Sequence, residues 1–251
     1  MTPGVAPPGP DLPPGSHVLP GGVAVSRLRV YDWPAADGAC GGTPHLHTVA
    51  AEGYLVTAGS GRVETLSREG LASTPLEPGV LAWFGPGTVH RLVDGGGLEI
   101  TTLMGDAGLP EAGDAVLTLP DEDLEPDRYG ALVRLPTGVA EEEVAAAARR
   151  RRDLALRGWA VLRAEVAAGR PQALERLHER AAAIVRPHLP AWRETWRAGA
   201  LARALASGEH LDALERGDVA HLGREPPQHR RPAPGPERFG MCGRLTTWPA
   251  T

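Results

Sequence analysis

The sequence predicts an α+β fold in which a small antiparallel β-barrel is followed by an α-helical region. Two patterns along the 251 residues support this prediction. From Val23 onward, short apolar runs alternate with polar residues and are separated by glycine-rich turns, as in the strands of a sandwich or barrel. After Pro136 the apolar residues recur at helical spacing, as in amphipathic helices. The chain is therefore expected to have a β-rich part and a helical part.

The β-rich part is expected to span residues 23–118. Its first strand is predicted at Val23–Tyr31, where apolar and polar side chains alternate. Further short strands are predicted at 54–57, 62–66, 80–84, 89–93 and 98–103. The runs Gly59–Gly61 and Gly95–Gly97 are interpreted as hairpin turns, because glycine readily adopts the positive φ that such turns require.

The other boundaries follow from changes in composition. We expect a flexible Pro/Gly-rich lead-in at 1–22, a linker at 119–138, a helical region at 139–222 and an irregular tail at 223–251. Within that tail, the apolar residues of 238–245 are expected to dock back onto the body.

The helical region shows one clear stripe and one run of charge. Apolar side chains at helical spacing form the stripe, and they are Leu174, Leu177, Ala181 and Ile184. Trp192 and Trp196 are expected to begin a third helix. The four arginines of 149–152 are interpreted as a solvated helix face balanced by the glutamates of 141–143, with an anion-binding patch as the alternative.

Composition excludes several classes of function. All 26 basic residues are arginine, so chemistry that needs a lysine, such as a Schiff base or a phosphate-loop lysine, is excluded. A net charge of -5 gives no basic surface for nucleic acid, and no apolar run is long enough to span a bilayer. Two cysteines, Cys40 and Cys242, are too few for a disulfide scaffold. Without a recognisable secretory signal, the expectation is a soluble cytoplasmic protein that binds neither nucleic acid nor membrane.

A metal site is predicted by the spacing of His45 and His47. On a strand these two residues point to the same face, and two imidazoles aimed at one place are most stable when both are neutral and share a cation. The alternative is a polar loop that carries two histidines without a shared ligand. Glu52 follows five residues later, and His90 follows the glycine-rich turn at Gly85–Gly87.

Together these two segments resemble the paired motifs of the cupin superfamily. The resemblance is to a single-domain, type-2-like metal-binding barrel, and the helical extension matches no family that we recognise. The resemblance to cupins implies that one divalent metal ion is bound inside the barrel by His45, His47, Glu52 and His90. The chain departs from the pattern mainly in its turns, and the departures are Ala39 for the leading glycine, the shifted Pro86 and Asp94 for the frequent asparagine.

The resemblance leaves several functions open. Three imidazoles and one carboxylate suit iron, manganese, nickel, cobalt or zinc, and they leave open positions for a small-molecule ligand. The first hypothesis is a metal-dependent enzyme on a small oxygen-rich substrate, of the dioxygenase or of the sugar or keto-acid isomerase type. The alternatives are a non-catalytic small-molecule binding or sensing module and a barrel with a purely structural metal. The pattern identifies no catalytic residue, does not decide whether the protein is an enzyme, and leaves a homodimer open.

Strand alternation also predicts substrate-binding side chains. Tyr54 and Val56 are expected to share the inward face of Glu52, and Thr88 to flank His90. Arg62, Glu64 and Trp83 are the other polar side chains expected in the pocket.

Overall fold

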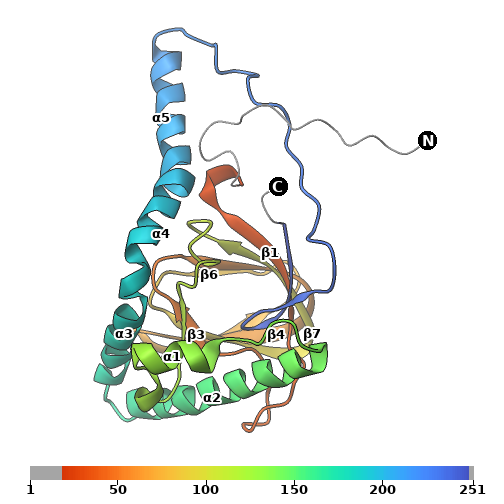
Figure 1. Cartoon of the computed structure of the whole chain (residues 1–251), viewed down its shortest axis with the longest axis vertical. Coiled ribbons are helices and arrows are strands. Elements are labelled where there is room, and N and C mark those ends of the chain that lie inside the picture. The colour runs from red at the N-terminus through yellow and green to blue at the C-terminus, as the bar shows by residue number, and fades with distance from the viewer. Residues whose placement is uncertain (1–18, 249–251) are drawn as a thin grey trace, which may run out of the picture.

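The computed structural model describes residues 19–248, which form a β-barrel with helices along one side (Figure 1). The strands are β1 (Ala24–Val30), β2 (Cys40–Gly41), β3 (His45–His47), β4 (Glu52–Ser67), β5 (Gly70–Leu76), β6 (Leu81–Phe84), β7 (Val89–Met104), β8 (Ala115–Leu117), β9 (Arg238–Phe239) and β10 (Gly243–Thr247). The α-helices are α1 (Pro126–Val133), α2 (Glu141–Ala167), α3 (Gln172–Val185), α4 (Leu189–Trp196) and α5 (Ala202–Glu215). Short helices are η1 (Pro20–Gly22), η2 (Asp121–Asp123), η3 (Arg186–His188) and the π-helical turn η4 (Arg197–Leu201). The predicted α+β fold is confirmed.

The barrel has two layers because β4 and β7 are long enough to contribute to both. The first half of β4 pairs with β6 and with the second half of β7, which in turn pairs with β1. The second half of β4 pairs with β5 and with the first half of β7, next to β2 and β3. We call the layer with β5, β3 and β8 the covered sheet, and the layer with β6, β1 and β10 the bare sheet.

The expected hairpin turns at 59–61 and 95–97 are wrong, because β4 continues through the first glycine run and β7 continues through the second. Three register shifts between Val56 and Gly61 instead bend the strand from one layer into the other. At this bend a side chain on Gly59 would collide with the carbonyl of Gly97, so glycine is needed for the close approach of the two strands.

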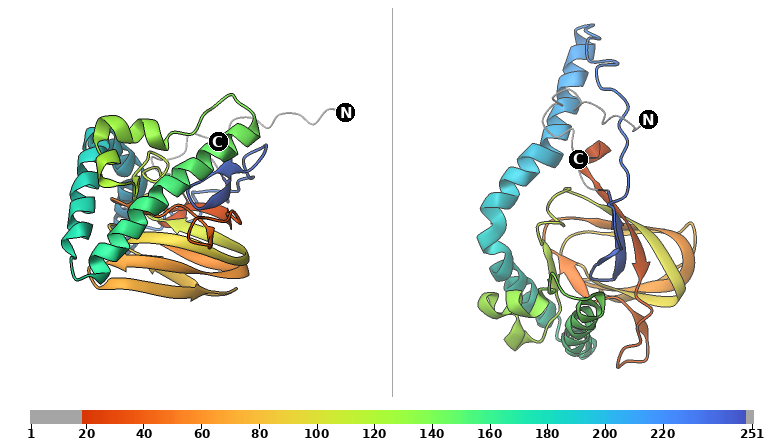
Figure 2. Two further views of the ribbon diagram at one scale, coloured as in Figure 1. Left: turned by 90° about the horizontal axis from the view of Figure 1, so that it is seen from below. Right: turned by 45° about the vertical axis from the view of Figure 1, so that its right-hand side comes forward.

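Helices cover the outer face of the covered sheet (Figure 2). Outward-facing side chains of that sheet form one apolar core with Trp159 of α2 and the stripe of α3; they are Leu46, Leu66, Val89 and Val116. The inward-facing side chains of both sheets form a second core within the barrel, which includes Tyr54, Leu92 and Ile100. Among the described helices, none combines the length and apolar character needed to cross a membrane.

The arginine run of α2 is not simply a solvated face, so that interpretation is wrong for two of its members. Arg152 is 2% exposed and donates hydrogen bonds to the carbonyls of Trp33 (2.7 Å) and Pro34 (2.9 Å). Arg151 donates to the carbonyls of Val133 and Gly240. A guanidinium group carries enough donors to satisfy several loop carbonyls at once, and these bonds fasten the loops around the barrel to α2.

Two segments expected to be irregular contain regular structure. The linker at 119–138 holds α1, whose Tyr129 hydroxyl accepts a hydrogen bond from the backbone of Leu117 (2.9 Å). The tail at 223–251 contributes β9 and β10, and β10 pairs with β1 to extend the bare sheet. The chain thus returns from the far end of α5 to the barrel, as the expected docking of 238–245 requires (Figure 1). Residues 1–18 of the expected lead-in lie outside the described residues.

Candidate metal centre

Four buried side chains from both sheets meet inside the barrel. His45 and His47 come from β3 and His90 from the first half of β7, all in the covered sheet, whereas Glu52 begins β4 in the bare sheet. One ligand atom from each of the four lies within 4.8 Å of all the others. The Nε2 atom of His90 is 3.1 Å from Nε2 of His45 and 3.0 Å from Oε2 of Glu52. The structure thus brings together all four residues predicted as metal ligands.

The tautomers of His45 and His90 follow from the partners of their other ring nitrogens. Nδ1 of His45 lies 2.9 Å from the carbonyl of Thr43, and Nδ1 of His90 lies 3.1 Å from the carbonyl of Thr88. A carbonyl only accepts hydrogen bonds, so each Nδ1 carries a proton, and Nε2 is the nitrogen that each ring turns toward the centre. Lone pairs crowded together beside a carboxylate oxygen are stable around a cation.

Asp114 orients His47, the third histidine, and no sequence motif identified Asp114. Its Oδ1 accepts a hydrogen bond from Nδ1 of His47 (2.6 Å), and its Oδ2 accepts one from the backbone of Ala50 (2.8 Å). The Asp114 side chain is fully buried just before β8. A carboxylate in this position fixes the orientation of a metal-binding imidazole and strengthens it as a ligand. The only available signal was an acidic residue next to a buried strand, which is too common to identify the site.

Burial and neighbouring charges set the protonation of His45, His47 and Glu52. Burial, reinforced by the charges of His90 and His47, lowers the pKa of His45 well below its usual value. Burial alone would raise the pKa of Glu52, but the charges and hydrogen bonds of His90 and His47 lower it well below its usual range. Burial opposes the charged form of His47, yet its bonds to Asp114 and Glu52 raise its pKa to about 10. Cation binding would therefore displace the proton that His47 holds on Nε2.

The donor set fits a divalent cation. Glu52 is ionised, and its buried Oε2 lies 3.0 Å from Nε2 of His90 and 3.3 Å from Nε2 of His47. Asp114 and two backbone carbonyls orient the three rings. A buried carboxylate needs positive charge beside it, and a bound cation supplies that charge.

One hydroxyl and one thiol lie beside the four side chains. Tyr54 is fully buried with no hydrogen-bond partner for its hydroxyl, and its ring lies 6.3 Å from that of His90. Burial and the negative charge of Glu52 raise the pKa of Tyr54 well above its usual value, so the phenol stays protonated. Cys242, which directly precedes β10, has its Sγ 4.0 Å from Nδ1 of His45, and burial raises the pKa of this thiol. Cys40, the other cysteine, lies in β2 opposite Asp94.

Four of the side chains expected in the substrate pocket, Arg62, Glu64, Trp83 and Thr88, lie outside it. The register shifts in β4 reverse the alternation, so Val63 faces inward and Arg62 faces outward to bond Glu64 (2.9 Å). Trp83 is 74% exposed on the outer face of β6. Thr88 supplies a backbone carbonyl to His90 but lines a groove outside the barrel. Among the polar side chains predicted for the pocket, Tyr54 alone lies beside the candidate ligands.

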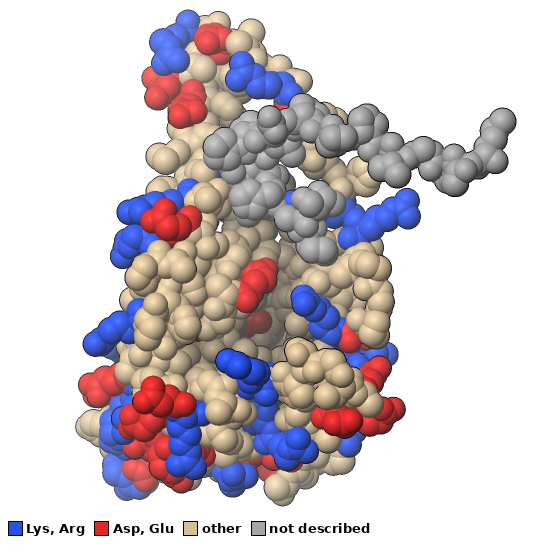
Figure 3. Space-filling view, viewed as in Figure 1, with Lys and Arg blue, Asp and Glu red and all other residues tan. Residues whose placement is uncertain are grey.

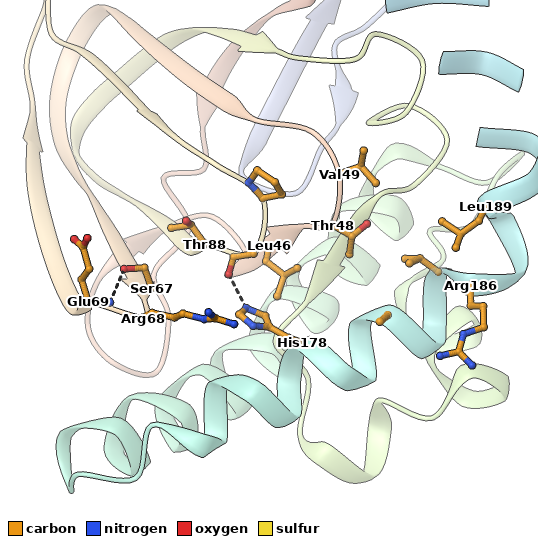
Figure 4. A pocket seen from close by; sticks show the side chains of 14 residues that line it. Leu46, Thr48, Val49, Ser67, Arg68, Glu69, Thr88, His178, Arg186 and Leu189 are labelled. Atoms are coloured by element: carbon orange, nitrogen blue, oxygen red, sulfur yellow. Dashed lines mark hydrogen bonds between the residues drawn. The ribbon is translucent and has the colours of Figure 1, made fainter. Parts of the chain in front are cut away.

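The groove that Thr88 lines lies between the covered sheet and α3 and has a volume of about 840 Å³ (Figure 4). His178 of α3 donates a hydrogen bond from Nε2 to the carbonyl of Gly87 (2.8 Å), and the backbone of Gly87 donates to the carbonyl of His47 (2.8 Å). A chain of two hydrogen bonds thus joins α3 to a predicted metal ligand. Figure 3 shows a second hollow, away from this groove, at the end of the barrel that faces the viewer in Figure 1. Acidic side-chain atoms are visible at the bottom of this hollow.

The comparisons with known proteins reach the barrel alone. No protein-family model and no curated protein matches this sequence. Similar solved structures include a double-stranded β-helix protein from Klebsiella pneumoniae, with 18% identity over 35% of this chain and 68% of the other and a TM-score of 0.27. Another is an oxalate oxidase in complex with the substrate analogue glycolate, with 24% identity over 36% of this chain and 53% of the other and a TM-score of 0.24.

A cupin protein from Bacteroides fragilis is also similar, with 17% identity, 34% of this chain and 65% of the other covered, and a TM-score of 0.24. The matched regions thus span about a third of this chain and between 53% and 68% of those three chains. The resemblance of this chain to cupins rests on its own two-segment spacing and on the four converging side chains.

Proposed function

We propose that this protein binds one divalent metal ion through His45, His47, Glu52 and His90 and acts as a metal-dependent enzyme on a small oxygen-rich substrate. The observation that carries the proposal is the convergence of three imidazole nitrogens and one ionised carboxylate, with the Nδ1 protons directed away from the centre. When bound, such an ion supplies Lewis acidity or oxygen activation and keeps coordination positions for a ligand. Iron, manganese, nickel, cobalt and zinc all accept these donors.

The chain's own residues favour an oxygen-rich substrate. Tyr54 presents a protonated phenol with no protein partner, so it can donate a hydrogen bond to a substrate oxygen. Phe84, whose ring lies 4.3 Å from that of His90, supplies an apolar wall that excludes water. We infer that 2-keto acids and vicinal hydroxy acids fit best, because two neighbouring oxygens can occupy adjacent open positions while Tyr54 holds a third polar atom.

Metal content tests the ligand set. The protein is purified without added metal and analysed by elemental analysis beside His47→Ala and a control, His188→Ala, which alters an exposed histidine outside the barrel. We expect about one equivalent in the wild type and the control and loss of most metal in His47→Ala, since removing one of four ligands opens the site. Near-stoichiometric metal in His47→Ala would contradict the assignment.

Substrate binding and turnover are tested next. A 2-keto acid should raise the melting temperature of the metal-loaded protein and leave the metal-stripped protein unchanged, because the ligand binds only the loaded site. Oxygen consumption with the binding acid would indicate the dioxygenase type, and an isomeric product without oxygen consumption would indicate the isomerase type. A metal without any ligand response would be structural, and the enzyme proposal would fail.

A second candidate, a binding or sensing module, is favoured by the contact between α3 and the metal centre. The bonds from His178 to Gly87 and from Gly87 to His47 would let ligand occupancy reach the helical region. Ligand binding to the loaded protein without any turnover would select this candidate over the enzyme.

A further inference from the structure

The outer face of the bare sheet carries an apolar patch. Its side chains are strongly exposed: Trp83 by 74%, Leu81 by 53%, Leu55 by 39% and Leu103 by 38%. The strand register makes them neighbours, since Gly53 of β4 lies between Trp83 of β6 and Leu103 of β7, and Leu55 lies opposite Leu81. We call these four side chains the Trp83 patch. Clustered exposure of this kind marks an interaction surface more often than single exposed residues do.

The Trp83 patch contains no charged residue. Across the sheet, the row that holds Trp83 and Leu103 continues with Val25 on β1, and the row that holds Leu81 and Leu55 continues with Thr101 on β7. The first charged side chain is Arg27, on β1, and it lies 3.5 Å from Glu237. A neutral apolar patch with a charged rim is typical of the centre of a protein–protein interface.

The backbone of β6 offers free hydrogen-bonding groups along the same border. The amide of Val56 donates to the carbonyl of Val80 (3.0 Å), so in an antiparallel ladder the next bonded residue of β6 is Ala82. Leu81 and Trp83, between the bonded positions, then direct their N–H and C=O groups away from β4. Within the described part of the chain, β6 pairs with β4 alone, so this edge is open. Native proteins rarely leave such an edge beside exposed apolar side chains unless something pairs with it.

We propose that the Trp83 patch and the open edge of β6 form a homodimer interface, with β6 paired antiparallel to β6 of a second copy. A twofold axis through Ala82 places Leu81 of one copy opposite Trp83 of the other, and both pairs then exchange backbone hydrogen bonds. A second copy is the matching partner because the free groups are symmetric about Ala82 and the neutral patch is complementary to itself. The two bare sheets become one continuous sheet, and each Trp83 packs on the partner's Leu81.

The dimer leaves the two metal centres separate. Glu52 and Tyr54 face the inside of the barrel, whereas Leu55 and the rest of the Trp83 patch face outward. The proposal therefore does not depend on the metal assignment. Loss of metal in His47→Ala should leave the dimer intact.

Molar mass in solution tests the interface on the full chain over a hundredfold range of concentration. We expect the wild type to have the mass of a dimer, and Trp83→Lys and Leu81→Lys to have that of a monomer, because each lysine removes the apolar cross-strand pair and a charge on an edge strand opposes pairing with a second strand. Val161→Lys is the control, since Val161 is 64% exposed on α2, away from β6, and should leave the dimer unchanged. Circular dichroism and metal content confirm that each variant is folded, as expected for substitutions at exposed positions.

Amide hydrogen exchange tests the register. The amides of Leu81 and Trp83 should be protected in the wild-type dimer and should exchange quickly in Leu81→Lys and Trp83→Lys. A wild type that stays monomeric at every concentration would overturn the proposal. So would a dimer that survives both lysine substitutions, or one in which the amides of β6 exchange quickly, since each would place the interface elsewhere.

Discussion

The two sheets of the barrel differ in what lies on their outer faces. On the covered sheet, Leu66 is fully buried beneath the helical region, whereas on the bare sheet Leu81 is 53% exposed. The two sheets also divide the metal centre, since the covered sheet supplies three histidines and the bare sheet supplies Glu52 and Tyr54. The helices thus support the side of the barrel that must hold imidazole rings in fixed orientations. In the proposed dimer, the bare sheet would offer the edge of β6 to a second copy.

The largest effect is expected from a pair of matched leucine substitutions. Leu66→Ala should lower the free energy of unfolding by about 2–5 kcal/mol, because it leaves a cavity between the covered sheet and the helices. Leu81→Ala should change it by less than about 0.5 kcal/mol, because the side chain is already in water. Urea unfolding of both variants in the Trp83→Lys background removes any contribution from dimer dissociation. Equal losses would show that the two outer faces do not differ in energy.

The sequence carried enough information for the fold and for the four converging side chains. Alternating residues predicted strands, helical spacing predicted α2 and α3, and the resemblance to the paired cupin motifs predicted that His45, His47, Glu52 and His90 would meet. The strands and helices depend on neighbours close in sequence, whose geometry is regular within one element. The meeting of His90 with His45 joins two strands, and it was predicted from the resemblance.

The failures involve contacts between distant segments. A glycine run serves equally well in a hairpin turn and at a bend where two strands cross, so Gly59–Gly61 was misassigned. The bulges at that bend reverse the alternation, which is why Arg62 was placed inside the barrel. Asp114 lies 67 residues from His47, and no local pattern connects them. Nor does the arginine run at 149–152 reveal that Arg152 will meet the carbonyl of Trp33.

Asp114→Asn should weaken metal binding by about 10–100-fold, which is the next largest effect. An asparagine cannot accept from both His47 and the backbone of Ala50, because one of its two polar atoms is a donor. His47 would then lose its fixed orientation or the loop would lose its anchor. Competition with a chelator measures the affinity, with Asp121→Asn as the control because Asp121 is exposed on the helical side.

A reduced affinity in Asp114→Asn would support a rigid histidine set on the covered sheet. The metal-loaded variant should keep the same number of bound ions when metal is in excess, since all four ligands are still present. Unchanged affinity would mean that the helices and β8 position His47 without Asp114. The inference that Asp114 fixes the orientation of His47 on the covered sheet would then be wrong.

Tyr54→Phe should give the smallest effect, and it examines the bare sheet's contribution to the site. The substitution removes only the hydroxyl, keeps the ring in the barrel core and leaves all four ligands in place, so metal content should not change. If the phenol donates a hydrogen bond to the substrate, its loss should cost about 0.5–1.5 kcal/mol of ligand binding, or roughly a factor of two to ten in affinity. Titration of the metal-loaded protein with the responding 2-keto acid measures this difference. Tyr31→Phe is the matched control, because the Tyr31 hydroxyl donates to the carbonyl of Gly240 outside the metal centre.

Because the Tyr54 hydroxyl has no partner in the protein, its removal should also slightly stabilise the ligand-free protein. Equal affinities for wild type and Tyr54→Phe would restrict the bare sheet's role in the site to Glu52.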